Sequence, residues 1–190
     1  MTFAYVSGHA GLDLVGTRKW RRRVEPEEQL VAPGALAAWA AGAGLTDDRL
    51  AVSELELDRA RTVRESLYRA VTAQRASICI GTADRQLLNV TAAQDPIGLD
   101  FDTSGRVRRQ VTVARLLTHV VRDTLELIAG ETFARVRECD EPDCTRLFVD
   151  SSRLGNRRWC GMAECGNRAK VRAFRERRAA ASPSAAMLSK

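Results

Sequence analysis

The sequence predicts a mainly α-helical protein made of two unlike parts. Apolar residues recur at helical spacing over most of residues 1–130, whereas four of the five cysteines and much of the positive charge lie in the last third of the chain. A helical apolar face needs a core to bury it, and 190 residues suffice for one medium core with a small appendage. We therefore expect a helical domain over 1–130, a small module over 131–180, and a disordered tail over 181–190.

The first long helices of the body are marked by signals at their ends. Residues 33–44 begin with a proline at the first helical position and end in glycines, which favours a short helix. Ser53 and Glu56 have the spacing of a capping box, in which each side chain binds a backbone N–H of the other residue. An apolar stripe behind this cap predicts a helix over 54–75. The stripe consists of Leu57, Ala60, Val63, Leu67, Ala70 and Val71.

Three further elements complete the predicted body. A helix is expected over 82–94. Its inward residues are expected to be Leu87, Leu88 and Val90. Residues 97–111 alternate apolar and polar side chains around a Thr-Ser-Gly turn at 103–105, which predicts a small β-hairpin. Residues 111–129 form the most hydrophobic helix of the chain, and Gly130 ends it.

Composition and the N-terminus favour a cytoplasmic protein. A hydrophobic content of 45% and a charged content of 28% are ordinary for a soluble globular protein. No apolar stretch approaches the roughly 20 residues of a membrane-spanning helix, and the N-terminus lacks the positive cluster and apolar run of a signal peptide. We therefore expect no membrane partner, and we expect the cysteines to be reduced rather than joined in disulfides.

The net charge of +6 is unevenly distributed. Residues 151–178 contain nine basic and two acidic side chains, which gives this segment a net charge of +7 and the rest of the chain −1. A positive charge confined to one short segment suggests a polyanionic partner, with nucleic acid as the first candidate. A solvated basic tail would have the same composition, so charge alone leaves both interpretations open.

Four cysteines have the spacing of a tetrahedral zinc site. The pairs Cys139-x4-Cys144 and Cys160-x4-Cys165 are separated by fifteen residues. Each pair can present two thiolates from one tight turn, and the loop between them can bring the pairs together. Four thiolates close the coordination sphere of the metal. We therefore expect one structural, non-catalytic Zn²⁺ in a treble-clef-like or ribbon finger.

Other interpretations of these cysteines stay open. Two disulfides or four free thiols are disfavoured by a reducing compartment, and an iron–sulfur cluster also accepts four thiolates. Zinc would supply the free energy that so short a segment cannot gain by apolar burial, on the order of 10 kcal/mol in small zinc modules. The fifth cysteine, Cys79, lies in an apolar run and is expected to be buried as a small hydrophobic residue.

A predicted helix rich in arginine and alanine follows the last cysteine, over 166–180. Val171 and Phe174 are expected to pack it against the zinc module. Arginine suits phosphate groups and guanine edges because its donors form a rigid fork, whereas Asn167 could read a base or cap the helix. The candidate nucleic-acid-binding residues are Arg153, Arg157, Arg158, Asn167, Arg168, Lys170, Arg172 and Arg175.

The combined cysteine and arginine motif resembles the CGNR zinc finger, a family named for the tetrapeptide found here at 165–168. The resemblance rests on Cys139-x4-Cys144, Leu147-Phe148-Val149-Asp150, Ser152-Arg153, Arg157-Arg158-Trp159-Cys160 and Cys165-Gly166-Asn167-Arg168 with Lys170. In that family the finger follows an all-helical domain called ABATE. Residues similar to that domain are Leu12-Asp13-Leu14-Val15-Gly16-Thr17, Leu36-x2-Trp39 and Arg64-Glu65-x-Leu67.

This resemblance implies a bacterial-type, stress-induced transcription regulator whose finger binds DNA. The helical domain would sense a signal or mediate dimerisation, which adds a small-molecule inducer and a second copy of the chain to the expected partners. Candidate ligand-binding residues, on the resemblance and residue type alone, are Asp13, Thr17, Arg18 and Trp39. The family usually has asparagine where this chain has Gly16, so a pocket that uses that asparagine would be altered here.

We therefore expect a zinc-dependent regulator that binds duplex DNA through the basic helix, with an affinity that falls steeply with salt. The alternative is an adaptor that binds protein or RNA through the same surface. Few aromatic residues lie near that surface (Phe148, Trp159 and Phe174), which argues against stacking on single strands. An enzyme is disfavoured, because no nucleophile is paired by its spacing with His9 or His119.

Overall fold

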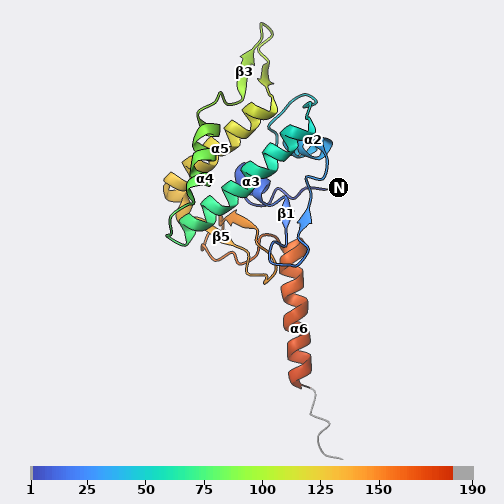
Figure 1. The fold of residues 1–190 in the computed structure, drawn as a ribbon. Helices are drawn as coiled ribbons and strands as arrows, with labels where there is room; N and C mark the ends of the chain where they lie inside the picture. Colours follow the sequence, from blue (N-terminus) through green and yellow to red (C-terminus); the bar gives the residue numbers. More distant parts are fainter. Residues whose placement is uncertain (1, 182–190) are drawn as a thin grey trace, which may run out of the picture.

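The computed structural model describes residues 2–181, and α-helices build the body of the protein (Figure 1). The body helices are α1 (Ala10–Val15), α2 (Pro33–Gly42), α3 (Glu54–Arg75), α4 (Thr82–Ala92) and α5 (Val113–Ala129). Helices α1, α4 and α5 each pack against α3, and α5 also packs against α1 and α4. Helix α2 covers a further part of α3. The prediction of a mainly helical body is confirmed.

Helix α3 lies at the centre of this bundle, and its ends are where the sequence predicted them. The side chain of Ser53 accepts a hydrogen bond from the Glu56 N–H, and the Glu56 carboxylate accepts one from the Ser53 N–H. None of the six residues of the predicted stripe is more than 5% exposed. Burial of this stripe dominates the stability of α3, because each buried leucine contributes about 1.5–3 kcal/mol and a cap about 1 kcal/mol.

Helix α4 shows where the apolar pattern misled the prediction. Leu88 is 2% exposed and Leu87 packs partly against the core, as expected. Val90, which was expected to face inward, is 60% exposed. Two positions along an α-helix correspond to a rotation of roughly 200°, so Val90 and Leu88 cannot both face one core.

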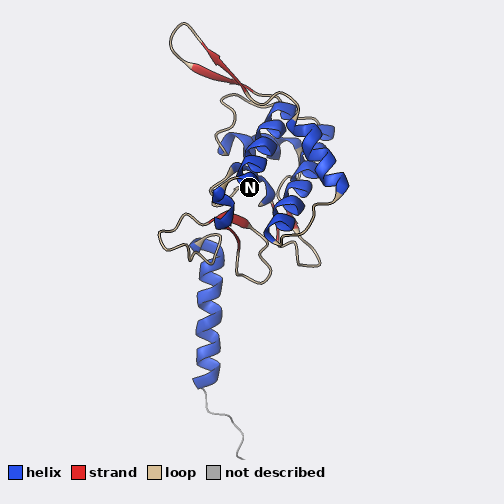
Figure 2. Cartoon of the chain, turned by 90° about the vertical axis from the view of Figure 1, so that its left-hand side faces the viewer, coloured by secondary structure: helices blue, strands red, loops and turns tan. Residues whose placement is uncertain are grey.

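Three two-stranded antiparallel sheets occur among the described residues. They pair β1 (Arg18–Lys19) with β2 (Glu27–Glu28), β3 (Gly98–Phe101) with β4 (Val107–Gln110), and β5 (Val136–Glu138) with β6 (Leu147–Val149). The β3–β4 pair is the predicted hairpin, and it projects from the bundle (Figure 2). The β1–β2 pair was not predicted, because strands of two residues are too short to show an alternating pattern.

The C-terminal part of the chain lies at the end of the bundle opposite the β3–β4 hairpin (Figure 1). A 3-10 turn, η1 (Glu131–Arg135), contacts α5, and β6 contacts α1. A π-helical turn, η2 (Met162–Gly166), leads into α6 (Asn167–Ala181), which extends away from the rest of the molecule (Figures 1 and 2). Apart from Ala181, the tail predicted over 181–190 lies outside the described residues. None of the described helices has the length and apolar character needed to cross a membrane.

Candidate metal centre and basic helix

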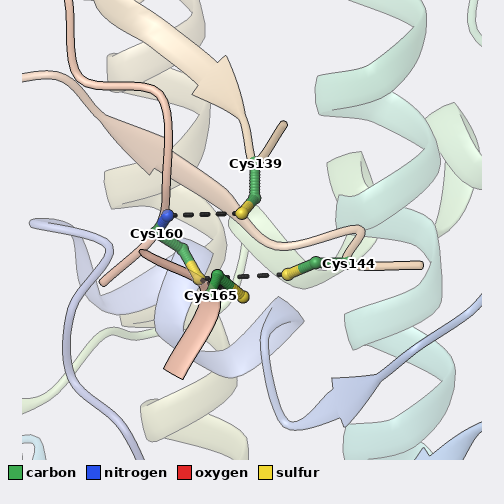
Figure 3. Close-up of side chains that lie close together, drawn as sticks. All are labelled: Cys139, Cys144, Cys160 and Cys165. Carbon is green, nitrogen blue, oxygen red and sulfur yellow. Dashed lines mark hydrogen bonds between the residues drawn. The ribbon is translucent and has the colours of Figure 1, made fainter. Parts of the chain in front are cut away.

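Four cysteine side chains lie close together (Figure 3), just before the N-terminal end of α6. The Sγ atoms of Cys139, Cys144, Cys160 and Cys165 all lie within 4.8 Å of one another, and each residue is at most 6% exposed. A tetrahedral Zn²⁺ with Zn–S bonds of about 2.3 Å places its sulfur atoms roughly 3.8 Å apart. The Sγ atoms of Cys144 and Cys160 are 3.9 Å apart. The four thiols therefore fit one structural zinc ion, with no coordination position left for water.

The same distances decide against disulfides. The Sγ atoms of Cys160 and Cys165 are 3.6 Å apart, whereas a disulfide requires about 2.05 Å. All five cysteines are free thiols. The prediction for Cys79 was wrong, because this residue is exposed. It lies in the irregular segment between α3 and α4, where Ile78 is also exposed and Ile80 packs against the core.

Hydrogen bonding among the four thiols, which together form a cage, shifts the pKa values of the cysteines in different directions. The bonds with Cys144 and Cys160 lower the pKa of Cys139, whereas the bond with Cys139 raises the pKa of Cys160 and of Cys165. Four thiolates this close would repel one another. A divalent cation removes this conflict by stabilising all four thiolates at once.

Local backbone structure presents the two cysteine pairs. Cys139 directly follows β5, and a hydrogen bond of 2.8 Å from the Cys144 N–H to the Glu141 carbonyl closes the first turn. The Cys160 N–H donates to the Sγ of Cys139 at 3.4 Å, which links the second pair to the first. Cys165 belongs to η2, so α6 starts two residues after the last ligand. The metal therefore fixes the point from which α6 leaves the module.

A loop from the N-terminal part of the chain completes the core of the finger. Trp20 is 5% exposed and packs with Phe148 and the four cysteines. The guanidinium groups of Arg23 and Arg168 lie 4.4 and 4.2 Å from the Trp20 ring. Because Arg168 is in the first turn of α6, Trp20 connects the body directly to the N-terminal end of this helix. We call residues 167–172 the root of α6.

The arginines beside Trp20 fasten the same loop to the first cysteine turn. Arg22 pairs with Glu138 and donates to the carbonyl of Pro142 at 3.2 Å. The Nε of Arg23 donates to Asp143 at 3.0 Å. This contact was not predicted, although the run Trp20-Arg21-Arg22-Arg23 sets this loop apart in the sequence. Body and finger are therefore packed together, not joined by a bare linker.

Two of the arginines proposed from the sequence to bind nucleic acid hold α6 to the finger. Arg172 donates to both carboxylate oxygens of Glu141, at 2.9 and 3.1 Å. Glu141 lies between the first two cysteines and is 7% exposed. Arg168 stacks on Trp20 and lies 3.4 Å from Glu164. These contacts set the direction in which α6 leaves the zinc module, and no sequence pattern indicated the Glu141 contact.

The arginines of the preceding loop differ in their surroundings. The Arg157 guanidinium stacks on Phe148 at 4.3 Å and donates to the carbonyls of Val6, Trp159 and Cys160. The Nε of Arg158 donates to Asp140 at 2.7 Å. Arg153 is exposed. Arg157 therefore stabilises the finger from inside, whereas Arg153 faces solvent.

The rest of α6 faces water. Lys170 and Arg175 are exposed, and the Asn167 side chain donates to the Ala163 carbonyl at 3.2 Å within its own helical turn. The prediction that Val171 and Phe174 pack α6 on the finger was wrong, since they are 49% and 57% exposed. The reason is that α6 extends away from the rest of the molecule, so little of its length is covered by other elements (Figure 1).

The four ligand-binding candidates have different surroundings. Asp13 accepts hydrogen bonds from the N–H groups of Val6 and Ser7, and burial raises its pKa. Thr17 donates to the Leu14 carbonyl and accepts from Arg64. Trp39 is 1% exposed in the core, and Arg18 lies at the surface 3.8 Å from Glu65. Asp13 and Thr17 are thus engaged in contacts that hold the fold.

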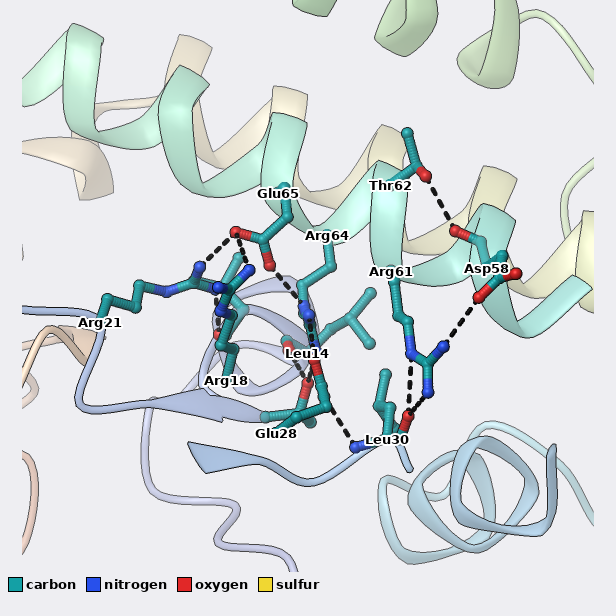
Figure 4. A network of polar contacts seen from close by, with 12 residues as sticks. Leu14, Arg18, Arg21, Glu28, Leu30, Asp58, Arg61, Thr62, Arg64 and Glu65 are labelled. Carbon is teal, nitrogen blue, oxygen red and sulfur yellow. Dashed lines mark hydrogen bonds and ion pairs between the residues drawn. The ribbon is translucent and has the colours of Figure 1, made fainter. Parts of the chain in front are cut away.

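A buried charge network beneath β1 and β2 was not predicted (Figure 4). Arg64 on α3 is 1% exposed, donates to both carboxylate oxygens of Glu28 at 2.6 and 2.5 Å, and pairs with Glu65 at 2.8 Å. Burial acts to raise the pKa of Glu28, but the hydrogen bonds and charge of Arg64 hold it below its usual value. Arg21 pairs with Glu65 from the other side. The network anchors on α3 both strands that flank the Trp20 loop.

The residue at position 16 connects the body to the finger through a close contact. A Cβ atom on Gly16 would lie 2.5 Å from Nη1 of Arg146, and Nη2 of the same arginine donates to the Gly16 carbonyl at 3.2 Å. Arg146 follows Cys144 by two residues and is 6% exposed. A larger residue at position 16 would force this arginine to move, so the glycine belongs to the contact between body and finger.

The two histidines of the sequence lie on or beside helices α1 and α5 of the body. His9 caps α1 by accepting from the Gly11 N–H, and its Nε2 lies 2.9 Å from the Asp123 carboxylate on α5. This hydrogen bond lowers the pKa of Asp123. His119 is half-buried on α5. His9 thereby ties α1 to α5.

Comparison with protein families agrees with this architecture. Residues 135–178 match the CGNR zinc finger, and residues 8–131 match ABATE, a family described as "Putative stress-induced transcription regulator". Neither is an enzyme family. No curated protein matches the chain. Since the ABATE match covers more than half of the chain and ends just before the zinc module, the protein belongs to the ABATE family and carries a C-terminal CGNR zinc finger.

Proposed function

We propose that the protein is a transcription regulator that binds duplex DNA through α6. The observation that carries the proposal is the placement of α6, which extends beyond the finger while its root is held by the metal site, Glu141 and Trp20. A helix of 15 residues is about 22 Å long, and the DNA major groove accepts one such helix. A rigid root matters because DNA contacts made at the far end need a fixed direction.

The basic residues of α6 divide into two roles under this proposal. Arg168 and Arg172 hold the helix in place, since both are engaged at its root. Lys170 and Arg175 are exposed and contact phosphates, with Arg153 as a further candidate on the loop. Phosphate contacts release counterions, so affinity for duplex DNA falls with salt in proportion to their number.

The test is a salt titration of binding to a random DNA duplex, followed by fluorescence anisotropy. The intact protein is compared with Lys170→Ala/Arg175→Ala, which removes two exposed charges without touching the root of α6. The variant is expected to bind more weakly at each salt concentration, and to lower the slope of log affinity against log salt by about 2. Zinc content is measured for both proteins and should be equal.

A control variant separates contact from net charge. Arg59→Ala/Arg85→Ala removes the same charge from exposed positions of α3 and α4. It should bind DNA as the intact protein does, because its charges lie on the body. Absence of binding at low salt, with the zinc site fully loaded, would refute the proposal. A loss equal to that of the α6 variant would show that net charge alone drives binding.

An adaptor that binds protein or RNA is the second candidate, and the exposed Val171 and Phe174 favour it. Of the aromatic residues near α6, Phe148 is buried and Trp159 packs against the finger core, which leaves Phe174 to stack on a base. Single-stranded binding proteins use several such residues. The same titration with single-stranded RNA is therefore expected to give weaker binding than duplex DNA.

We further propose that residues 1–130 form the sensing or dimerisation domain and residues 131–180 the DNA-binding module. A single helix buries little surface on DNA, so two copies bound together would raise the affinity of each. Light scattering should then give about twice the chain mass of 20.9 kDa. A monomeric mass at the concentrations that bind DNA would remove dimerisation from the proposal.

A further inference from the structure

We propose that Val171 and Phe174 are specificity-determining residues that contact methyl groups in the DNA major groove, so that the protein prefers thymine-containing sites. The inference rests on the proposed function and adds to it a chemical class of base contact. Thymine presents a C5 methyl group to the major groove, beside the hydrogen-bonding edges of the bases. An apolar pair on a groove-binding helix matches that methyl group.

The position of the two side chains on α6 supports this role. Residues three apart on an α-helix share a face, so Val171 and Phe174 form one patch. Phe174 is two positions from Arg172, which places the two side chains roughly 160° apart around the helix axis. Because Arg172 is bound to Glu141, Phe174 points away from Glu141, whereas Val171 lines a groove that begins at Ala163 and Glu164 of η2. The contact that anchors α6 therefore presents Phe174 outward, with Val171 between it and the finger.

The surroundings of the patch match a polyanion. Lys170 and Arg175 flank it in sequence, and both are exposed. A surface groove of about 600 Å³ runs beside the helix, and Val171 lines it together with three arginines and the two carboxylates of Glu164 and Glu176, so that its basic side chains outnumber its acidic ones. Apolar groups between cations match the major groove, where base edges with methyl groups lie between two rows of phosphates.

Charge also argues against a second copy of α6 as the occupant. Residues 167–178 carry six basic side chains and one acidic side chain, a net charge of +5. Two such helices packed patch to patch would bring like charges together, which is unfavourable. DNA would instead neutralise this charge while covering the apolar patch. The helix therefore fits a nucleic-acid groove better than it fits itself.

The experiment uses two pairs of duplexes, and the members of each pair differ in one methyl group per base pair. Alternating A·T duplex is compared with A·U duplex, which lacks the thymine methyl. Alternating G·C duplex is compared with the same duplex carrying 5-methylcytosine, which places a methyl group at the corresponding position. Binding of the intact, zinc-loaded protein is measured by anisotropy at one salt concentration.

The methylated member of each pair is expected to bind more tightly, by about fourfold for each methyl group that the patch buries. Val171→Ala/Phe174→Ala should bind both members of a pair equally, with unchanged zinc content and an unchanged salt slope. Leu55→Ala is the matched control, because Leu55 is an exposed apolar residue on α3, 82% exposed and outside the finger. It should keep the full preference for methylated duplex.

The outcomes separate this inference from the function on which it rests. Equal binding of the intact protein to both members of each pair would overturn the inference and leave DNA binding by α6 intact. Absence of binding to all four duplexes would refute the proposed function itself. Light scattering of the intact protein and of Val171→Ala/Phe174→Ala tests the alternative that a second copy of the chain covers the patch. A dimer that becomes a monomer in the variant would assign the patch to a second copy and overturn the inference.

Discussion

The body and the finger of this protein are held together by different forces. Among the described residues, the body cluster contains 23 buried apolar residues, two of which, Val136 and Leu147, come from β5 and β6 of the finger, whereas the finger cluster contains six, four of which are the cysteines. The other two are Phe148 and Trp20, and Trp20 comes from the body. A helical bundle of this size gains its stability from apolar burial, but a segment of about fifty residues needs a metal ion and a neighbour.

The largest test of this difference is removal of the metal. Zinc contributes on the order of 10 kcal/mol to modules of this kind, so a chelator should unfold the finger and the root of α6. The body should keep a cooperative thermal transition of its own, because 21 of the 23 buried residues in its core lie outside the finger. Circular dichroism during chelation, followed by a thermal melt, measures both parts.

Two cysteine variants control the zinc experiment. Cys160→Ser removes a ligand and should reproduce the chelated state without added chelator. Cys79→Ser changes an exposed thiol outside the cage and should melt as the intact protein does. Loss of the body transition together with the finger would show that the two regions form one cooperative unit.

The second test concerns the residue that the finger takes from the body. Replacement of a buried tryptophan by alanine costs about 3–5 kcal/mol, and Trp20→Ala would also remove the support beneath Arg168. Residues that surround a metal site contribute about 10–100-fold to its affinity. We therefore expect weaker zinc binding in a chelator competition assay. Val24→Ala, a fully exposed residue of the same loop, should have no effect.

The third test affects the body by breaking its buried charge network. Arg64→Met keeps the length of the side chain but leaves Glu28 and part of Glu65 without a partner, which costs about 3 kcal/mol. Breaking a buried ion pair costs about 3–5 kcal/mol, and the lower end of this range applies because the Glu28 side chain is 30% exposed. A shift in melting temperature of about 2–4 °C per kcal/mol is expected for a chain of this size.

The pH dependence of this effect follows from the lowered pKa of Glu28. A carboxylate with a lowered folded-state pKa stabilises the protein above its unfolded value of 4.5, and this contribution is lost as the pH falls through the folded-state pKa. The difference in stability between the intact protein and Arg64→Met should therefore be large near neutral pH and shrink below 4.5. A difference that stays constant in urea melts over this range would contradict the role of Glu28.

The smallest test concerns the cap of α3. Ser53→Ala removes one half of the capping box and should lower the free energy of unfolding by about 1 kcal/mol. Zinc affinity should stay unchanged, because α3 contributes apolar burial and no ligand. A change in zinc binding on this substitution would mean that the stability of the body reaches the finger through α3.

Features that depend on local sequence were predicted well. The bounds of α3, its capping box and its buried stripe follow from nearest neighbours along one helix. The four cysteines form the expected cage because their spacing leaves few ways to satisfy a tetrahedral ion. The β3–β4 hairpin follows from alternation around a turn. In each case the information lies within about twenty-five residues of chain.

Features that depend on which surfaces meet could not be predicted. Cys79 and the apolar residues Val171 and Phe174 of α6 were expected to be buried, yet they are exposed. An apolar residue is buried only where a second element covers it, and most of α6 extends away from the module. The inward contacts of Arg157 were equally hidden, because its acceptors come from three separate residues, one of them at the N-terminus.

The sequence by itself therefore determined the helices, the zinc ligands and the basic character of the last helix, since these depend on spacing and residue type. The tertiary structure alone decided which arginines are engaged in contacts within the protein. Arg172 is engaged because Glu141 lies opposite it, and Arg168 because Trp20 reaches across from the body. Lys170 and Arg175 have the same charge but face solvent. Charge is a property of the residue, whereas its availability to a partner depends on what the fold places beside it.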